Sequence, residues 1–191
     1  MSNDNIVTET LTVGGDGMTD WPQIIAIHGG TVLKTARRLL NNDADVADCF
    51  QETFVAAFEF SRKQTIQNWP GLVTRLATRR ALDRLRKRKN DGANLIGLDK
   101  ALEVAGRSMA PPAVAEENEL FQQLREGLAE LPSDQAEACC LRFLENLSYE
   151  QIAVELEVTV SHVGVLLHRA KLSLKDRLSA FAPVGHEEVN K

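Results

Sequence analysis

The chain has 191 residues and a hydrophobic content of 43%, which allows one ordinary domain or two small ones and argues against global disorder. Aromatic residues make up only 5%, so the composition favours helices over sheets. The net charge of −5 would by itself argue against a nucleic-acid-binding protein. This average hides a basic segment, residues 75–89, in which one acid, Asp83, stands against eight bases: Arg75, Arg79, Arg80, Arg84, Arg86, Lys87, Arg88 and Lys89.

The three cysteines do not form the pattern of a disulfide framework or a zinc site. Their number is odd, Cys139 and Cys140 are adjacent, and no Cys-x-x-Cys occurs. We expect these two and Cys49 to be small buried residues. The amino terminus lacks the pattern of a signal peptide, and no run approaches the roughly 20 apolar residues that span a bilayer. We therefore expect a cytoplasmic protein without membrane insertion.

No combination of residues typical of an enzyme is present. The sequence has no Ser/His/Asp set, no paired-carboxylate site and no glycine-rich phosphate loop. His162 and His168 are six residues apart and do not share a helix face, so a metal pair is not expected. We expect neither catalytic activity nor a cofactor.

Helical spacing of apolar residues predicts three helices in the first half of the chain. Residues 1–19 are polar and glycine-rich and are expected to form a disordered tail. The first helix runs from Pro22 to about Leu40, with a break or kink expected at Gly29-Gly30, because each glycine costs about 1 kcal/mol relative to alanine. It is followed by a turn at residues 41–45, a helix with Val46, Phe50, Phe54 and Ala57 on one stripe, a loop at residues 61–67, and a long helix at residues 68–89.

Residues 91–115 differ in composition from the segments on either side. Glycine and proline recur there and the periodicity is weak, which predicts a flexible interdomain linker with a short helix near Leu98 to Val104. The predicted fold is therefore all-α, with two small helical domains at residues 20–90 and 116–181. A polar tail is expected at residues 182–191.

The second domain has the pattern of a helix-turn-helix. Ser148 and Gln151 are spaced as a capping box, which starts a short helix. Residues 157–159 then separate this helix from a longer amphipathic one. In a helix-turn-helix the second helix enters the major groove of DNA. The alternative is an ordinary helical hairpin.

The basic segment places arginines in two rows along the long helix. Arg75 and Arg79 are one turn apart, and so are Arg80 and Arg84. Such rows could meet backbone phosphates, and binding would then weaken steeply with salt. The alternative is a solvated helix face.

An acidic segment, residues 45–54, begins the second helix. Asp48 and Glu52 lie one turn apart, and Asp45 lies one turn before Asp48. Like charges at this spacing destabilise a helix by a few tenths of a kcal/mol, partly offset by the helix dipole. The acids could face a basic partner surface, or they could be a soluble helix start.

The three segments, in this order, resemble the extracytoplasmic-function group of bacterial sigma factors. Residues 45–54 resemble the family's Asp-x-x-Asp-x-x-Gln-Glu-x-Phe pattern, which docks on the clamp helices of RNA polymerase. Residues 77–88 resemble the following helix, which in the family faces the minus-ten promoter element. Leu131-Pro132, residues 147–153 and residues 167–171 resemble the region that binds the minus-thirty-five element.

The resemblance implies a role for particular positions. The residues that would bind the polymerase core are Asp45, Asp48, Gln51, Glu52 and Phe54. Those that would meet DNA on the minus-ten side are Arg75, Arg79, Arg80 and Arg84. Those that would meet DNA through the helix-turn-helix are Arg142, Ser161, His162, Val165, Arg169 and Lys171.

We therefore expect an alternative sigma factor that binds RNA polymerase core and promoter DNA, and the family often adds an anti-sigma factor as a partner. Two other functions stay open. One is a helix-turn-helix regulator that never recruits polymerase. The other is a degenerate protein that binds an anti-sigma partner, which is favoured by the apolar Val165 and Leu166. With Gly164, these residues stand where the family has Lys, Ser and Arg.

Overall fold

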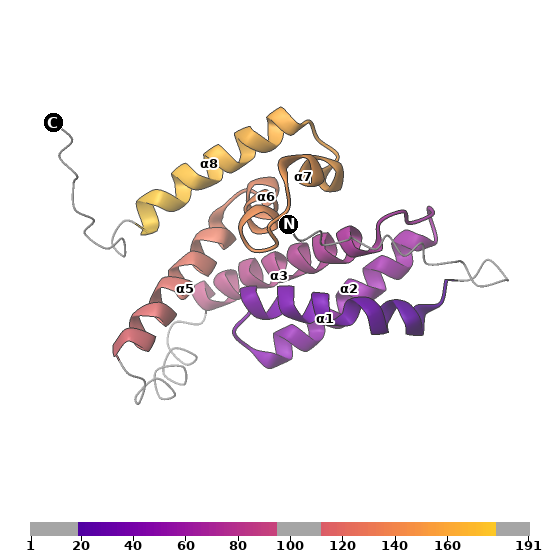
Figure 1. The fold of residues 1–191 in the computed structure, drawn as a ribbon. Coiled ribbons are helices and arrows are strands. Elements are labelled where there is room, and N and C mark those ends of the chain that lie inside the picture. The colour runs from indigo at the N-terminus through magenta and orange to yellow at the C-terminus, as the bar shows by residue number, and fades with distance from the viewer. Residues whose placement is uncertain (1–18, 95–111, 179–191) are drawn as a thin grey trace, which may run out of the picture.

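The computed structural model describes residues 19–94 and 112–178, and their regular structure is entirely helical (Figure 1). The all-α prediction is therefore confirmed for this part of the chain. The helices are α1 (Trp21–Leu39), α2 (Asp43–Ser61), α3 (Trp69–Asn94), α5 (Pro112–Glu130), α6 (Ser133–Phe143), α7 (Tyr149–Leu156) and α8 (Val160–Leu178).

Helix α1 begins at the predicted start, because the Asp20 side chain accepts a hydrogen bond from the Gln23 backbone N–H at 3.1 Å. The predicted break at Gly29-Gly30 is wrong, since α1 continues through both glycines. Gly29 is buried, and a β-carbon there would lie 3.3 Å from Cε2 of Phe50 on α2. Close helix packing at this point outweighs a propensity loss of about 1 kcal/mol per glycine.

Helices α1, α2 and α3 pack around a small apolar core. At one end of it the Trp21 ring meets the rings of Phe58 and Trp69 edge-on, with centroids 5.4 and 5.6 Å apart. Edge-on ring pairs add about 0.5–1.5 kcal/mol beyond the buried area. These contacts join the first turns of α1 and α3 to the last turns of α2. The core itself is formed by Ile24, Val32, Phe54, Val73 and Ala77.

Helices α7 and α8 form the predicted helix-turn-helix, and α6 packs against both. The capping box is confirmed: Ser148 Oγ accepts from the Gln151 N–H at 3.2 Å, and Gln151 Oε1 accepts from the Ser148 N–H at 2.8 Å. The turn after α7 contains Glu157 with φ of 56°, in the left-handed region that favours glycine. The unit has its own core, formed by Ala138, Leu141, Ile152, Ala153, Val163, Leu166 and Leu167.

Helix α5 packs on α8 at Gly127, where a β-carbon would lie 2.6 Å from Cδ2 of Leu174. Only glycine lets the two helices approach this closely without displacing that leucine. Helix α5 thereby connects the helix-turn-helix to the rest of the molecule.

The two halves share one apolar core, which the sequence did not predict. Leu39 and Leu82 of the first half lie in the same buried cluster as Leu131 and Cys140 of the second. Figure 1 shows α5 and α6 lying against α3. The expectation of buried cysteines is confirmed, because all three are free and buried, and burial raises the pKa of the Cys49 and Cys139 thiols to about 11.

The helix ends differ from the predicted boundaries of the linker. Helix α3 continues to Asn94, past the predicted domain end at residue 90, and α5 begins at Pro112 rather than at residue 116. A proline fits the first turn of a helix because its missing N–H has no partner there anyway. The predicted short helix at residues 98–104 and both predicted tails lie outside the described residues, apart from Thr19 at the inner end of the first tail.

Candidate partner surfaces

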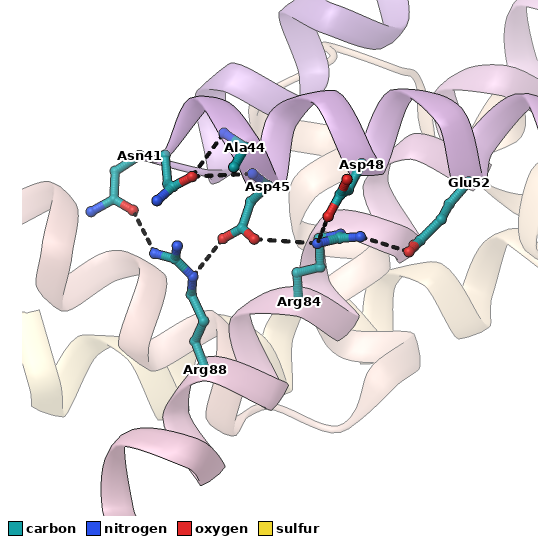
Figure 2. Close-up of polar contacts among 8 residues, drawn as sticks. Asn41, Ala44, Asp45, Asp48, Glu52, Arg84 and Arg88 are labelled. Atoms are coloured by element: carbon teal, nitrogen blue, oxygen red, sulfur yellow. Dashed lines mark hydrogen bonds and ion pairs between the residues drawn. The ribbon is translucent and has the colours of Figure 1, made fainter. Parts of the chain in front are cut away.

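Three carboxylates of α2 converge on one arginine of α3, as Figure 2 shows. Arg84 Nη1 lies 3.2 Å from Asp45 Oδ1 and 3.2 Å from Asp48 Oδ2, and Arg84 Nη2 lies 2.6 Å from Glu52 Oε1. One turn further along α3, Arg88 Nε lies 2.5 Å from Asp45 Oδ2. We call these five side chains the Arg84 cluster; formally it holds three negative and two positive charges.

The local sequence explains why the acids stand in one row. Asn42 caps α2, since its Oδ1 accepts from the N–H groups of Ala44 at 2.8 Å and Asp45 at 3.2 Å. The acids then repeat along one face of the helix, where alone they would repel one another. Arg84, which lies on the neighbouring helix α3, offsets this repulsion with its positive charge. Burial by itself would lower the pKa of the Arg84 guanidinium, but its hydrogen bond to Glu52 and the nearby carboxylates raise that pKa overall, so the group stays charged.

The outer side of the Arg84 cluster is acidic. The Asp48 and Glu52 side chains are 58% and 48% exposed, whereas those of Asp45 and Arg84 are each 18% exposed. Gln51 is exposed beside them. Phe54, in contrast, lies in the core of the first half, where its ring contacts that of Phe50 at 5.0 Å. Of the five residues in the predicted polymerase set, three are therefore on the surface as the sequence suggested: Asp48, Gln51 and Glu52.

The four arginines predicted to meet DNA on the minus-ten side do not share one surface. Arg84 belongs to the acid cluster, and Arg80 is half-buried on α3. Arg75 and Arg79 face the second half of the chain. Arg75 Nη1 lies 3.8 Å from Glu157 Oε1, and Arg79 Nε lies 3.9 Å from Oε1 of the buried Glu137.

Helix α8 presents most of its predicted recognition residues to solvent. Thr159 Oγ1 accepts a hydrogen bond from the His162 N–H at 3.2 Å at the start of this helix. Arg142 differs from the others, because it is half-buried on α6, donates to the Leu147 carbonyl at 2.8 Å and lies 5.4 Å from the Tyr149 ring centre. The exposed members of the set are Ser161, His162, Val165, Arg169 and Lys171.

The three departures of α8 from the family pattern have different positions. Val165 is exposed, whereas Leu166 is buried in the helix-turn-helix core. Gly164 is half-buried, and a β-carbon there would lie 3.9 Å from Cε2 of Tyr149. Only Val165 therefore changes the outward face fully.

Sequence reasoning missed the residues that join the helices and the halves. Arg88 could have been found, because it lies one helical turn after Arg84 and so shares its face. Glu137 on α6 and Glu145 after it bind Arg79 and Arg38 of the first half. Their partners are more than 50 positions away in sequence, and no local pattern indicates such pairs.

Two absences concern the described residues alone. In residues 19–94 and 112–178, no group of three or more His, Cys, Asp or Glu side chains could hold a metal ion. None of the helices seen there is long and apolar enough to cross a membrane.

In a comparison with known proteins, each half of the chain matches a family model. The family models "Sigma-70 region 2" and "Sigma-70, region 4" match residues 24–90 and 121–174. The chain is 28% identical over 174 residues to the ECF RNA polymerase sigma factor SigE of Mycolicibacterium smegmatis, covering 90% of this chain and 67% of SigE. It is 24% identical over 165 residues to SigW of Bacillus subtilis, covering 81% and 87% of the two chains.

A solved structure has a similar fold. It is that of CnrH in complex with the cytosolic domain of CnrY, with a TM-score of 0.51 and 21% identity over 84% of this chain and 88% of CnrH. At this identity the likeness concerns the fold alone.

The helical first half, the helix-turn-helix and the two matched regions together define a transcription initiation factor of the sigma-70 type. More narrowly, the chain belongs to the extracytoplasmic-function group of RNA polymerase sigma factors. Proteins of this family are not enzymes; they bind RNA polymerase and promoter DNA. The chain is thus an alternative sigma factor for transcription initiation, the first of the three functions considered from the sequence.

Proposed function

We propose that the outward face of α2, carried by Asp48, Gln51 and Glu52, binds the polymerase core. The observation that carries this proposal is the row of two half-exposed carboxylates whose inner sides are held by Arg84. A basic partner would meet acids whose direction is already fixed, so less rotamer entropy would be lost on binding. Asp45, being mostly covered, supports the row from behind.

The same proposal assigns promoter DNA to two other places. Arg75 and Arg79 of α3 would approach the minus-ten element by leaving their long ion pairs with Glu157 and Glu137, at 3.8 and 3.9 Å, because guanidinium groups suit phosphates. The exposed side of α8 would approach the minus-thirty-five element through Ser161, His162 and Arg169, with Val165 offering an apolar contact. Lys171 extends this side toward the DNA backbone.

Two predicted contact residues receive a different role in this proposal. Phe54 packs in the core beneath α2, and we assign it the support of the docking face rather than a contact. Arg142 supports the turn before α7 through the Leu147 carbonyl and the Tyr149 ring. Both would act through the surfaces that they hold in place.

The proposal also covers the cellular compartment of the protein and a protein partner besides the polymerase. A factor that acts on RNA polymerase would work in the cytoplasm. CnrH was solved with a protein partner, the cytosolic domain of CnrY. Because the family often adds an anti-sigma factor as a partner, we propose that such a protein binds this chain as well, which co-purification from its own cells would test.

The polymerase-binding proposal is tested with Asp48→Asn combined with Glu52→Gln. Neutral residues are chosen because a lysine at either place would be pushed against Arg84. We expect binding to purified core polymerase to weaken at least about tenfold, in the range found when charged contacts are removed from interfaces. Titration of labelled protein with core measures this, and circular dichroism should show unchanged helix content.

The matched control is Glu59→Gln, another exposed acid of α2, which lies outside the Arg84 cluster. It should leave core affinity within about twofold, since an isolated surface charge contributes little. Equal affinities for the double variant, the control and the unchanged protein would contradict the proposed docking face.

A further inference from the structure

We infer that Arg84 is a positioning residue for polymerase docking and does not contact promoter DNA. The inference deepens the proposed function, because it rests on the outward face of α2 being the docking site. It also reverses the expectation from the sequence, in which Arg84 belonged with Arg80 to one of two basic rows of α3 that could meet DNA. The evidence is the direction of its side chain and the use of its donors.

The guanidinium of Arg84 is committed to α2 (Figure 2). Its Nη1 contacts one carboxylate oxygen of Asp45 and one of Asp48, and its Nη2 contacts one carboxylate oxygen of Glu52. Its Nε is buried, so the inner edge of the group faces protein rather than solvent. To reach a phosphate, the side chain would have to leave all three acids.

Loss of Arg84 would affect each of the three acids in a different way. Asp45 is largely buried and, among the described residues, would keep Arg88 as its remaining ion-pair partner. Asp48 and Glu52 are on the surface, one turn apart, and their repulsion would no longer be offset. Their side chains would turn outward independently, and the docking row would lose its fixed geometry.

The geometry also requires arginine rather than any base. A guanidinium is planar and presents several N–H donors in fixed directions, whereas a lysine ammonium is a compact charge on a flexible stem. One lysine could not hold Asp45 and Glu52, which lie on opposite sides of the Arg84 head, in the same manner. Arg84→Lys should therefore retain the charge but not the function.

Two binding assays separate positioning from DNA contact. The first measures the affinity of the full chain for core polymerase, and the second measures promoter affinity of the holoenzyme at saturating core. For Arg84→Gln and Arg84→Lys we expect core affinity to fall at least about fivefold, with promoter affinity within about twofold of the original. For Arg79→Gln, the matched arginine on the same helix, we expect the opposite pattern.

A double-mutant cycle with Glu52→Gln completes the test. Positioning predicts that the losses of core affinity from Arg84→Gln and Glu52→Gln are less than additive, because both break one contact. Additive losses, unchanged core affinity, or a fall in promoter affinity alone would each overturn the inference. A fall in the melting temperature with core affinity kept would show a merely structural role and would overturn it too.

The cycle is informative even where the proposed docking face is wrong. In that case Glu52→Gln leaves core affinity unchanged, and the failure lies with the proposed function. Coupling between the same two variants in thermal unfolding then still reports whether the Arg84–Glu52 contact forms. A loss of core affinity in Glu52→Gln but not in either Arg84 variant would sink the positioning role alone.

Discussion

The outward faces of α2 and α8 are both surfaces proposed for large partners, and we assign a supporting arginine to each, but the two arginines act differently. Arg84 pairs directly with the charges that the α2 face presents. Arg142 instead contacts the Leu147 carbonyl and the ring of Tyr149, the first residue of α7, and α7 in turn packs on α8. On the α2 face an ion pair holds the exposed charges directly. On the α8 face the supporting arginine instead stabilises the backbone of a neighbouring segment.

The two faces also stand on different cores. The α2 face rests on the cluster shared by both halves, through Cys49 and Leu82, and on the core of the first half, through Phe54. The α8 face rests largely on the separate core of the helix-turn-helix, with Ala170 and Leu174 reaching the shared cluster. Substitutions in the shared core, beside the helix-turn-helix and in its turn therefore separate the supports of the two faces.

The largest effect is expected from Leu82→Ala in the shared core. Leu82 is fully buried, and removing such a leucine side chain destabilises a protein by about 2–5 kcal/mol through lost burial and a cavity. Because residues of both halves line this cluster, we expect the whole chain to melt in one earlier transition. Calorimetry measures this, and two separated transitions would show that the halves unfold independently.

The control for this substitution is Leu172→Ala on α8, where the leucine is 54% exposed. A surface change of this kind should alter stability by no more than about 0.5 kcal/mol. A comparable loss from both variants would argue against the shared cluster as the main support.

A smaller effect is expected from Arg142→Ala beneath the helix-turn-helix. It removes a hydrogen bond from a charged group to the Leu147 carbonyl and the contact with Tyr149, together about 1–3 kcal/mol. Thermal denaturation measures the loss, and binding to core polymerase should be kept. Arg169→Ala on the exposed side is the matched control, and a similar destabilisation there would show that Arg142 has no special supporting role.

The smallest effect, and a favourable one, is expected from Glu157→Gly in the turn between α7 and α8. Glu157 has φ of 56°, so glycine removes the conformational strain, for a gain of up to about 1 kcal/mol. The long ion pair with Arg75 is lost, but Glu157 is 78% exposed, and such pairs contribute little. A melting temperature that fell instead would mean that the pair with Arg75 outweighs the strain.

The sequence predicted the fold class and most helices because they depend on local patterns. The capping box at Ser148, the apolar stripes and the buried cysteines were all visible in spacing and composition. The break at Gly29 was predicted wrongly, since propensity alone does not show that Phe50 packs there. Contacts across long separations, such as Arg79 with Glu137, leave no mark in the local sequence.

The sequence predicted which segments form the candidate surfaces, but not which residues in them are exposed and which pair with other residues of the chain. Asp48 and Glu52 are on the surface as the acidic pattern suggested, and whether they bind the polymerase core stays a prediction. The two predicted rows of arginines looked equivalent, because spacing along α3 shows which residues share a face but not which helix packs against that face. Once α2 is packed on α3, Arg84 is separated from Arg75 and Arg79.

Helix α3 is continuous from Trp69 to Asn94, and this has a consequence for how the proposed surfaces are spaced. The arginine that faces α2 and the one that faces Glu137 are five residues apart, about 7.5 Å along the axis at 1.5 Å per residue. A single residue inserted between Arg79 and Arg84 would turn one against the other by about 100°. The angle between the side of α3 that faces α2 and the side that faces Glu137 is therefore set by the number of residues between the two arginines. No substitution that preserves the helix can change this angle.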